Sequence, residues 1–224
     1  PISVKLCGYR YNTKVGDFGC IQHPKYNFIG ASPDGIIIDK KSSRYGRMLE
    51  IKNIVNRVID GIPKMEYWIQ MQIQMETCDL NECDFLETQF IEYDSYIDYI
   101  ADGSFNITND NKYKGIIVLF CEDENLIYEY APFNIGEQEY KKWENEIMDK
   151  NIDKEWIQNI YWKLEKYSNV LVLRNKLWFN NIVDSIKEVA EIIENEKVTG
   201  YEHRAPNKRK LNKITSENKC LINI

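Results

Sequence analysis

Apolar and polar positions change their spacing along the chain, and each change indicates a new element. Two short apolar runs, 36–38 and 48–52, flank a polar segment that contains glycine and serine, which predicts a β-hairpin. Residues 64–77 carry apolar positions three and four apart, and Pro63 is acceptable at their start, which predicts a helix. The same reasoning predicts strands at 85–93, 113–120 and 126–133, helices at 137–148, 154–165 and 178–196, and short strands or packed turns at 4–6 and 18–21.

The second run of the hairpin carries charge at alternate positions. Side chains alternate across a strand, so Glu50 and Lys52 share one face. Asp34 stands at the mouth of the first strand, beside the flexible Gly35, and can lean towards that face. Burying two carboxylates and an ammonium between apolar strands is costly unless something pairs them. A divalent cation held by Asp34 and Glu50 is the natural partner, and Lys52 can then meet an anionic oxygen or a water molecule.

The helix predicted at 64–77 has a polar but uncharged face. Tyr67, Gln70 and Gln74 lie on this face, at i, i+3 and i+7. Such a face can lie along a substrate or support a charged site. Gln72 lies among apolar neighbours on the helical wheel, so we expect it to make a buried hydrogen bond.

Composition narrows the class of protein only slightly. Apolar residues make up 43% of the 224 residues and charged residues 29%, a balance typical of soluble globular proteins. The net charge of −6 does not resemble that of a nucleic-acid binder, although bulk charge is a poor guide when acids bind metal ions. No apolar run is long enough to span a membrane and no basic-then-apolar signal sequence opens the chain, so we expect no membrane partner.

Two further features are the cysteines and a basic run near the end of the chain. The six cysteines include no CxxC pair, so we expect reduced thiols in an intracellular protein and neither a structural zinc site nor an iron–sulfur cluster. The segment 204–213 holds five Lys or Arg and no acid. This segment is either a solvent-exposed tail or an arm that contacts phosphates. If it is an arm, Arg204, Lys208 and Arg209 are the candidate phosphate-binding residues.

Three sequence blocks in a fixed order carry a resemblance to a known family. They are SPDG at 32–35, LEIK at 49–52 and YWIQMQIQM at 67–75. Together they resemble the lambda-exonuclease and YqaJ-type viral recombinase family of the PD-(D/E)xK nuclease superfamily, with clear similarity over residues 28–93. In two respects the sequence departs from the family pattern. Few residues precede Asp34, where the family has helices, and Asn53 follows Lys52 where the family usually continues with Cys-Pro.

The resemblance implies a fold and a division of the chain. The expected fold class is α/β, with a restriction-endonuclease-like core of a central mixed β-sheet flanked by helices, and a C-terminal helical extension. We therefore divide the chain into a nuclease core at 1–135, a helical extension packed on it at 136–200, and a basic, flexible tail at 201–224.

The resemblance also implies an activity and its partners. It implies hydrolysis of DNA phosphodiester bonds with one or two Mg2+ or Mn2+ ions, by an exonuclease that acts on duplex ends and can also have endonuclease activity. The setting would be viral recombination, repair or defence, in the host cytoplasm or at a viral replication site. A homo-oligomer that encloses DNA and a recombination or helicase partner are further expectations by family analogy.

The residue roles follow from the matched motifs. By resemblance, Asp34 and Glu50 are metal ligands, and the backbone carbonyl of Ile51 is an additional ligand. Lys52 would orient the attacking water and stabilise charge on the phosphate, with Tyr67 and Gln70 as its support. The expected substrate contacts are Ser32, Gln74, Arg204, Lys208 and Arg209.

Other interpretations of the same residues stay open. In isolation, Asp34 could be a turn residue of Pro-Asp-Gly, and Glu50 and Lys52 could form an exposed cross-strand pair. The chain could also be a catalytically silent DNA-binding or recombination scaffold that keeps the nuclease fold, although a scaffold needs none of the three charged groups. A small-molecule phosphohydrolase is a third class.

Overall fold

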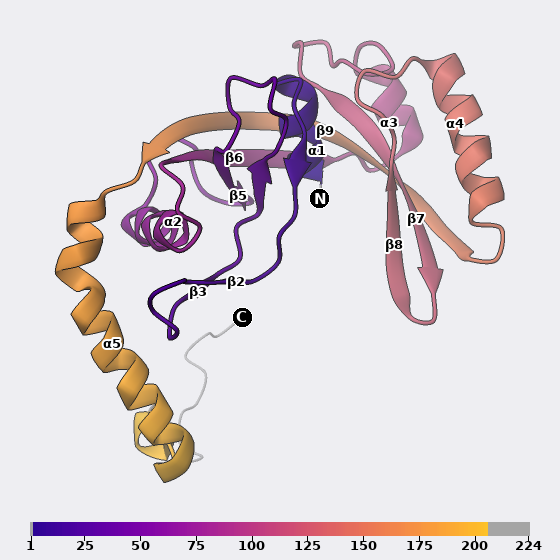
Figure 1. Ribbon diagram of the computed structural model, residues 1–224. Helices are drawn as coiled ribbons and strands as arrows, with labels where there is room; N and C mark the ends of the chain where they lie inside the picture. The colour runs from indigo at the N-terminus through magenta and orange to yellow at the C-terminus, as the bar shows by residue number, and fades with distance from the viewer. Residues whose placement is uncertain (1, 206–224) are drawn as a thin grey trace, which may run out of the picture. The chain divides into compact units, whose positions relative to one another are not determined.

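The computed structural model describes residues 2–205 (Figure 1). Two compact units make up the chain, Pro1–Asn180 and Asn181–Ile224. The first unit contains every described strand and the candidate site. Among residues 2–205, no helix combines the length and apolar character needed to cross a bilayer.

A seven-stranded mixed sheet forms the first unit, in the order β1-β4-β5-β6-β9-β7-β8. Its strands are β1 (Val15–Gly16), β4 (Gly35–Ile37), β5 (Met48–Asn53), β6 (Glu82–Glu92), β7 (Lys114–Glu122), β8 (Asn125–Tyr130) and β9 (Glu155–Leu173). Only β5 and β6 pair in parallel; the other pairs within this sheet are antiparallel. A separate two-stranded sheet joins β2 (Ile21–Gln22) to β3 (Gly30–Ala31). The predicted mixed α/β class is confirmed.

Two helices cover opposite faces of the sheet where β5 and β6 lie. The helices within the described residues are α1 (Ile2–Arg10), α2 (Met65–Thr77), α3 (Tyr96–Ala101), α4 (Glu137–Lys150) and α5 (Lys176–Thr199), with a 3-10 turn at Glu202–Arg204. Met48 and Phe85 pack against the α2 methionines in one apolar cluster, whereas Leu49 packs with Cys7 of α1 in another. Since neighbouring residues of a strand point to opposite faces, α1 and α2 lie on either side of the sheet (Figure 1).

Most of the predicted elements are confirmed, but two are wrong. The hairpin, the helix at 64–77, the strands at 85–93, 113–120 and 126–133, and the helices at 137–148 and 178–196 all form, with small shifts of their ends. The segment 154–165, expected to be a helix, instead begins the long strand β9. Trp162 and Leu164 are buried on one side of β9, and pairing with both β6 and β7 outweighs the local helical spacing.

The second wrong element is the strand or turn expected at 4–6. These residues lie in α1, and Leu6 and Cys7 are fully buried against the sheet. The division of the chain at residues 135 and 200 stays a prediction, with the qualification that 136–200 also supplies a strand of the main sheet. Five cysteines, those in the described part, are free thiols, and burial raises the pKa of Cys7 to about 11.

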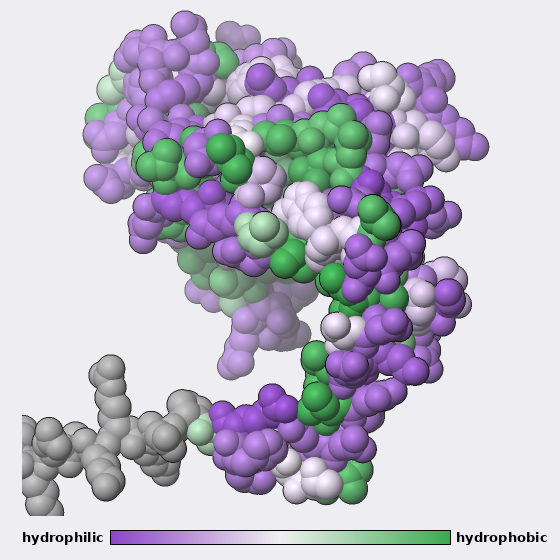
Figure 2. All heavy atoms as spheres, turned by 90° about the vertical axis from the view of Figure 1, so that its left-hand side faces the viewer, coloured by the Kyte–Doolittle hydropathy of each residue, from purple (hydrophilic) through white to green (hydrophobic). Residues whose placement is uncertain are grey.

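Exposed apolar side chains interrupt the polar surface of the face shown in Figure 2. Within the first unit, the loop between β5 and α2 contributes several exposed apolar groups. Val55, Val58 and Ile62 are 78%, 74% and 69% exposed. This loop begins one residue after the end of the strand that carries Glu50 and Lys52.

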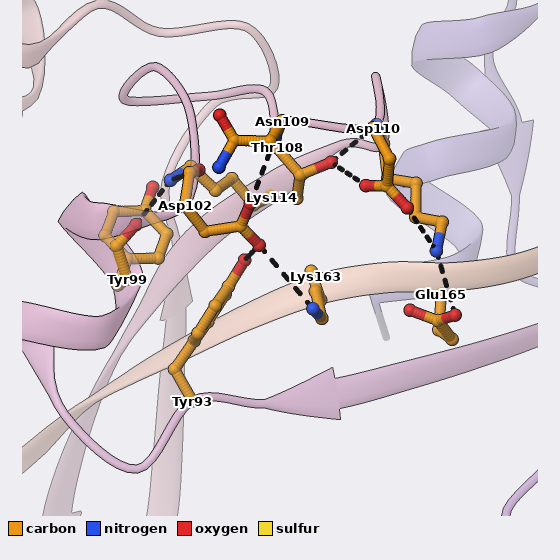
Figure 3. Close-up of polar contacts among 10 residues, drawn as sticks. Tyr93, Tyr99, Asp102, Thr108, Asn109, Asp110, Lys114, Lys163 and Glu165 are labelled. Atoms are coloured by element: carbon orange, nitrogen blue, oxygen red, sulfur yellow. Dashed lines mark hydrogen bonds and ion pairs between the residues drawn. The ribbon is translucent and has the colours of Figure 1, made fainter.

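A buried lysine anchors α3 and the loop after it to the sheet (Figure 3). The ammonium of Lys114, at the start of β7, donates to the backbone carbonyls of Tyr99 and Asp102, at the end of α3. It lies 4.4 Å from the centre of the Tyr99 ring, and burial lowers its pKa. The Asp102 side chain accepts hydrogen bonds from the Tyr93 hydroxyl at 2.7 Å and the Asn109 amide at 3.0 Å. Lys114 therefore supplies donors to carbonyls that a helix end leaves unpaired.

Candidate active site

The site lies at the N-terminal end of β4, where Asp34 immediately precedes the strand. The registered pairing of β4 with β5 runs from Ile36–Met48 to Gly35–Leu49 and goes no further. At the next position along β5 that faces β4, the Asp34 carboxylate accepts the Ile51 amide hydrogen, with a distance of 2.6 Å. The Asp34 carboxylate thus takes the place of the backbone carbonyl that would accept this hydrogen bond in a continuing strand pair. Asp34 itself is exposed.

Glu50 is the buried centre of the site. It is 1% exposed, and one carboxylate oxygen forms an ion pair with the Lys52 ammonium. The other oxygen accepts a hydrogen bond from the Gln74 amide at 3.1 Å. Burial raises the pKa of Glu50, the hydrogen bond from Lys52 opposes this shift, and the neighbouring charge of Asp34 reinforces it. Two contacts bring Asp34 and Glu50 close: Asp34 accepts the amide hydrogen of the residue after Glu50, and Gln74 contacts both Glu50 and the backbone of Ser32.

Lys52 is held by the helix that covers this face. Its ammonium donates to the Gln70 side-chain oxygen at 3.2 Å and lies 4.8 Å from the centre of the Tyr67 ring. Tyr67 and Gln70 stand three residues apart on α2, so they face the same strand. The structure therefore brings Lys52, Tyr67 and Gln70 together, and the catalytic roles expected for them stay predictions.

The glutamines of α2 divide into two roles. Gln74 is buried, and its amide also reaches the backbone carbonyl of Ser32, at 3.4 Å. It therefore links Glu50 to the segment that carries Asp34, while Ser32 itself is exposed. The buried hydrogen bonds predicted for Gln72 are confirmed. Its side chain donates to the Leu173 carbonyl at 3.0 Å and accepts from the Asn175 amide at 2.6 Å.

The departure from the family pattern at Asn53 lies on the opposite face. The Asn53 side-chain oxygen accepts hydrogen bonds from Ser3 of α1 at 2.6 Å and from Thr88 of β6 at 2.7 Å. This network ties the exit of β5 to α1. The helix α1 also occupies the position before the first sheet strand, where the sequence alone did not predict a helix.

Two charged residues on the face of the site were not predicted from the sequence. Glu87 of β6 is registered beside Lys52 and is fully buried, and its carboxylate forms an ion pair with Arg57 of the β5–α2 loop. The Arg57 guanidinium lies 5.5 Å from the centre of the Tyr67 ring. The position of Glu87 among the apolar residues of a strand could have marked it as a candidate. No feature of the sequence around Arg57 indicates that it pairs with Glu87.

The basic residues nominated near the end of the chain lie outside the unit that contains this site or outside the described residues. Arg204 lies in the unit Asn181–Ile224, where its guanidinium pairs with Glu196 at 2.6 Å. Lys208 and Arg209 lie outside the described residues. Their expected phosphate contacts stay predictions.

The side chains present fit a hard divalent cation. Asp34 and Glu50 supply carboxylate oxygens, and Mg2+ commonly binds one or two carboxylates while keeping several waters. No group of three or more His, Cys, Asp or Glu side chains arranged to hold a metal occurs in the part of the chain that the structure describes. A cation at this site would therefore depend on two carboxylates, backbone oxygens such as that of Ile51, water and substrate.

Asp34, Glu50 and Lys52 thus form an acid–acid–lysine site on a mixed sheet, supported by the glutamines of α2. Residues 5–81, which contain this site, match the YqaJ-like viral recombinase domain. The resemblance predicted from the three sequence blocks is confirmed.

Known proteins resemble the chain to different extents. Uncharacterized protein R354 of Acanthamoeba polyphaga mimivirus is 29% identical over 223 residues, which cover 84% of this chain and 40% of that protein. The chain thus spans less than half the length of this curated relative. The crystal structure of an alkaline exonuclease, LHK-Exo from Laribacter hongkongensis, aligns with a TM-score of 0.44 and 16% identity, over 89% of this chain and 70% of that one. The same enzyme in complex with dAMP aligns with a TM-score of 0.43.

Proposed function

We propose that this chain is a metal-dependent DNA nuclease, a lambda-type exonuclease that hydrolyses phosphodiester bonds at duplex ends. The observation that carries the proposal is the buried Glu50 carboxylate, held by Lys52 and Gln74 beside the exposed Asp34. The charge of Asp34 raises the pKa of Glu50, which weakens the ion pair between Glu50 and Lys52. A purely structural ion pair would gain nothing from such a neighbour. The match to the YqaJ-like viral recombinase domain supports the same class of activity.

The residues of the site take distinct roles in this proposal. Asp34 and Glu50 would hold one or two Mg2+ or Mn2+ ions, with the Ile51 carbonyl as a further ligand. When bound, such an ion polarises the scissile phosphate and lowers the pKa of water. Lys52 orients the attacking water and stabilises negative charge on the phosphate oxygens, because its ammonium is fixed by neighbouring groups before the substrate arrives.

The helix α2 acts as the support of these groups. Gln70 and Tyr67 fix Lys52, and Gln74 fixes Glu50. Because the Gln74 amide is buried and donates to Glu50, we assign it a positioning role in place of direct substrate contact. Ser32 is exposed beside Asp34 and remains a proposed substrate contact.

Digestion of end-labelled linear and covalently closed circular DNA tests this function. We expect linear duplex to be degraded from its ends with Mg2+ or Mn2+, circular DNA to survive, and EDTA to stop the reaction. The position of the label also reports the polarity of digestion. Binding of duplex without degradation in either metal would contradict the nuclease and favour a DNA-binding scaffold. Faster turnover of a nucleotide or sugar phosphate than of DNA would favour a phosphohydrolase.

Partners and setting extend the proposal. A homo-oligomer that encloses DNA would account for processive digestion, and a recombination or helicase partner would supply or use the processed ends. The proposed setting is the host cytoplasm or a viral replication site. Native mass measurement with and without duplex DNA tests the oligomer.

A further inference from the structure

Arg57 lies beside the candidate site and is fixed by three features. Its guanidinium pairs with the Glu87 carboxylate, packs over the Tyr67 ring at 5.5 Å, and comes from the loop that follows β5 directly. Lys52 lies over the same ring at 4.8 Å. Tyr67 therefore organises two cations, one from the strand and one from the loop.

Glu87 is placed to hold Arg57 and is not placed to hold the proposed cation. It is fully buried and registered beside Lys52, on the same face of the sheet as Glu50. Yet it forms no three-residue metal-binding group with the two carboxylates of the site, among the residues that the structure describes. One of its oxygens pairs with Arg57, and the other, Oε2, is buried with no hydrogen-bond partner among residues 2–205. A buried carboxylate is costly unless a cation balances it, and Arg57 is the cation that pairs with Glu87.

Arg57 retains the capacity to bind an anion. Its side chain is 23% exposed, so part of it reaches the surface. A guanidinium has five N–H donors in a fixed plane, and within the described residues a single hydrogen bond from it, to Glu87, is formed. Fixing the plane by a buried carboxylate and an aromatic ring lowers the entropic cost of binding a phosphate.

We propose that Arg57 binds a phosphate of the DNA substrate next to the candidate site, with Glu87 and Tyr67 as positioning residues. This inference rests on the proposed function, because it takes DNA as the ligand. The alternative is that the Arg57–Glu87 pair only fastens the β5–α2 loop to the sheet.

The structure offers a matched control in Arg44. Its guanidinium pairs with the buried Asp84 at 2.5 Å and lies 3.7 Å from the centre of the Tyr11 ring. Arg44 and Arg57 are 24% and 23% exposed, and their acidic partners are 2% and 0% exposed. Asp84 and Glu87 are three residues apart on β6, so the two pairs lie on opposite faces of the sheet. Asp84 also pairs with Arg47 at 3.1 Å, so Arg44→Gln leaves its acidic partner with a second cation, and the thermal stability of each variant separates this difference from an effect on DNA binding.

The test compares Arg57→Gln with Arg44→Gln in the full chain. Binding of a short labelled duplex is measured without divalent metal over a range of salt concentrations, and the thermal stability of each variant is recorded. We expect Arg57→Gln to weaken binding about tenfold and to reduce the slope of log affinity against log salt by about one contact, roughly 0.9. Arg57→Lys should restore the slope, and Arg44→Gln should leave it unchanged. In the digestion assay, Arg57→Gln should raise KM about tenfold with kcat within roughly threefold of the wild-type value.

Each outcome decides between the two roles of Arg57. An unchanged salt slope in Arg57→Gln, or an equal loss of slope in Arg44→Gln, would overturn the inference. If Arg57→Gln does not fold, the double variant Arg57→Met with Glu87→Leu replaces the ion pair with apolar groups of similar size and should show the same reduced slope. Wild-type binding that depends on Arg57, with no cleavage in Mg2+ or Mn2+, would refute the nuclease proposal while retaining this one.

Discussion

Glu50→Gln should abolish DNA cleavage, with a loss of rate of about a thousandfold or more. The substitution keeps the size of the side chain and its neighbours Lys52 and Gln74, but removes the buried negative charge that would hold a cation. A thousandfold loss corresponds to about 4 kcal/mol of transition-state stabilisation, which is within the contribution expected of a bound metal ion. Single-turnover digestion of linear duplex in Mg2+ or Mn2+ measures the effect.

Two further variants show whether the loss of cleavage in Glu50→Gln is specific to the site. Glu92→Gln removes an exposed carboxylate at the end of β6 and should retain cleavage. Lys52→Met should also lose cleavage, but it should keep metal affinity because both carboxylates remain. Cleavage by Glu50→Gln at a rate near that of the wild type, with the protein folded, would refute the assignment of Glu50.

Lys114→Met should destabilise the first unit by about 3 kcal/mol, which corresponds to roughly 6–12 °C in melting temperature for a unit of this size. The substitution removes the donors of two backbone carbonyls, those of Tyr99 and Asp102, and a charged group that packs on the Tyr99 ring (Figure 3). Methionine fills similar space but donates no hydrogen bond, so the buried carbonyls at the end of α3 lose their partner. Chemical unfolding followed by circular dichroism measures the difference.

Lys112→Met is the matched surface control. Lys112 pairs with Asp110 at 2.7 Å and Glu165 at 2.8 Å, and its side chain is 28% exposed. Partly exposed ion pairs of this kind contribute less than about 1 kcal/mol. Similar stability losses for Lys112→Met and Lys114→Met would show that the buried position of Lys114 has no special importance for α3.

The parts of the site that could be predicted from sequence are those that depend on local spacing. Alternation along a strand sufficed to place Glu50 and Lys52 on one face, and helical spacing sufficed to place Tyr67 three residues before Gln70. The hairpin also followed from two apolar runs around a turn. Each of these features involves residues close together in the chain.

Features that depend on distant partners could not be predicted in this way. The pairing of Arg57 with Glu87 joins a loop to a strand thirty residues later, as the sequence separation of their hydrogen bond shows. The segment 154–165 has apolar spacing compatible with a helix, and only its neighbours β6 and β7 make it a strand. Similarly, α1 forms where its buried residues meet the sheet, although its sequence is only weakly amphipathic.

The position of β9 limits how this protein can be divided experimentally. It pairs with β6 from Glu82–Leu173 to Glu92–Trp162 and with β7 from Lys114–Lys163 to Cys121–Glu155. A fragment that stopped at residue 135 would retain Asp34, Glu50 and Lys52 but would leave long edges of both β6 and β7 open to intermolecular pairing. The site residues lie in the first third of the sequence, but the sheet that carries them needs β9, which is translated much later, to cover its open edges.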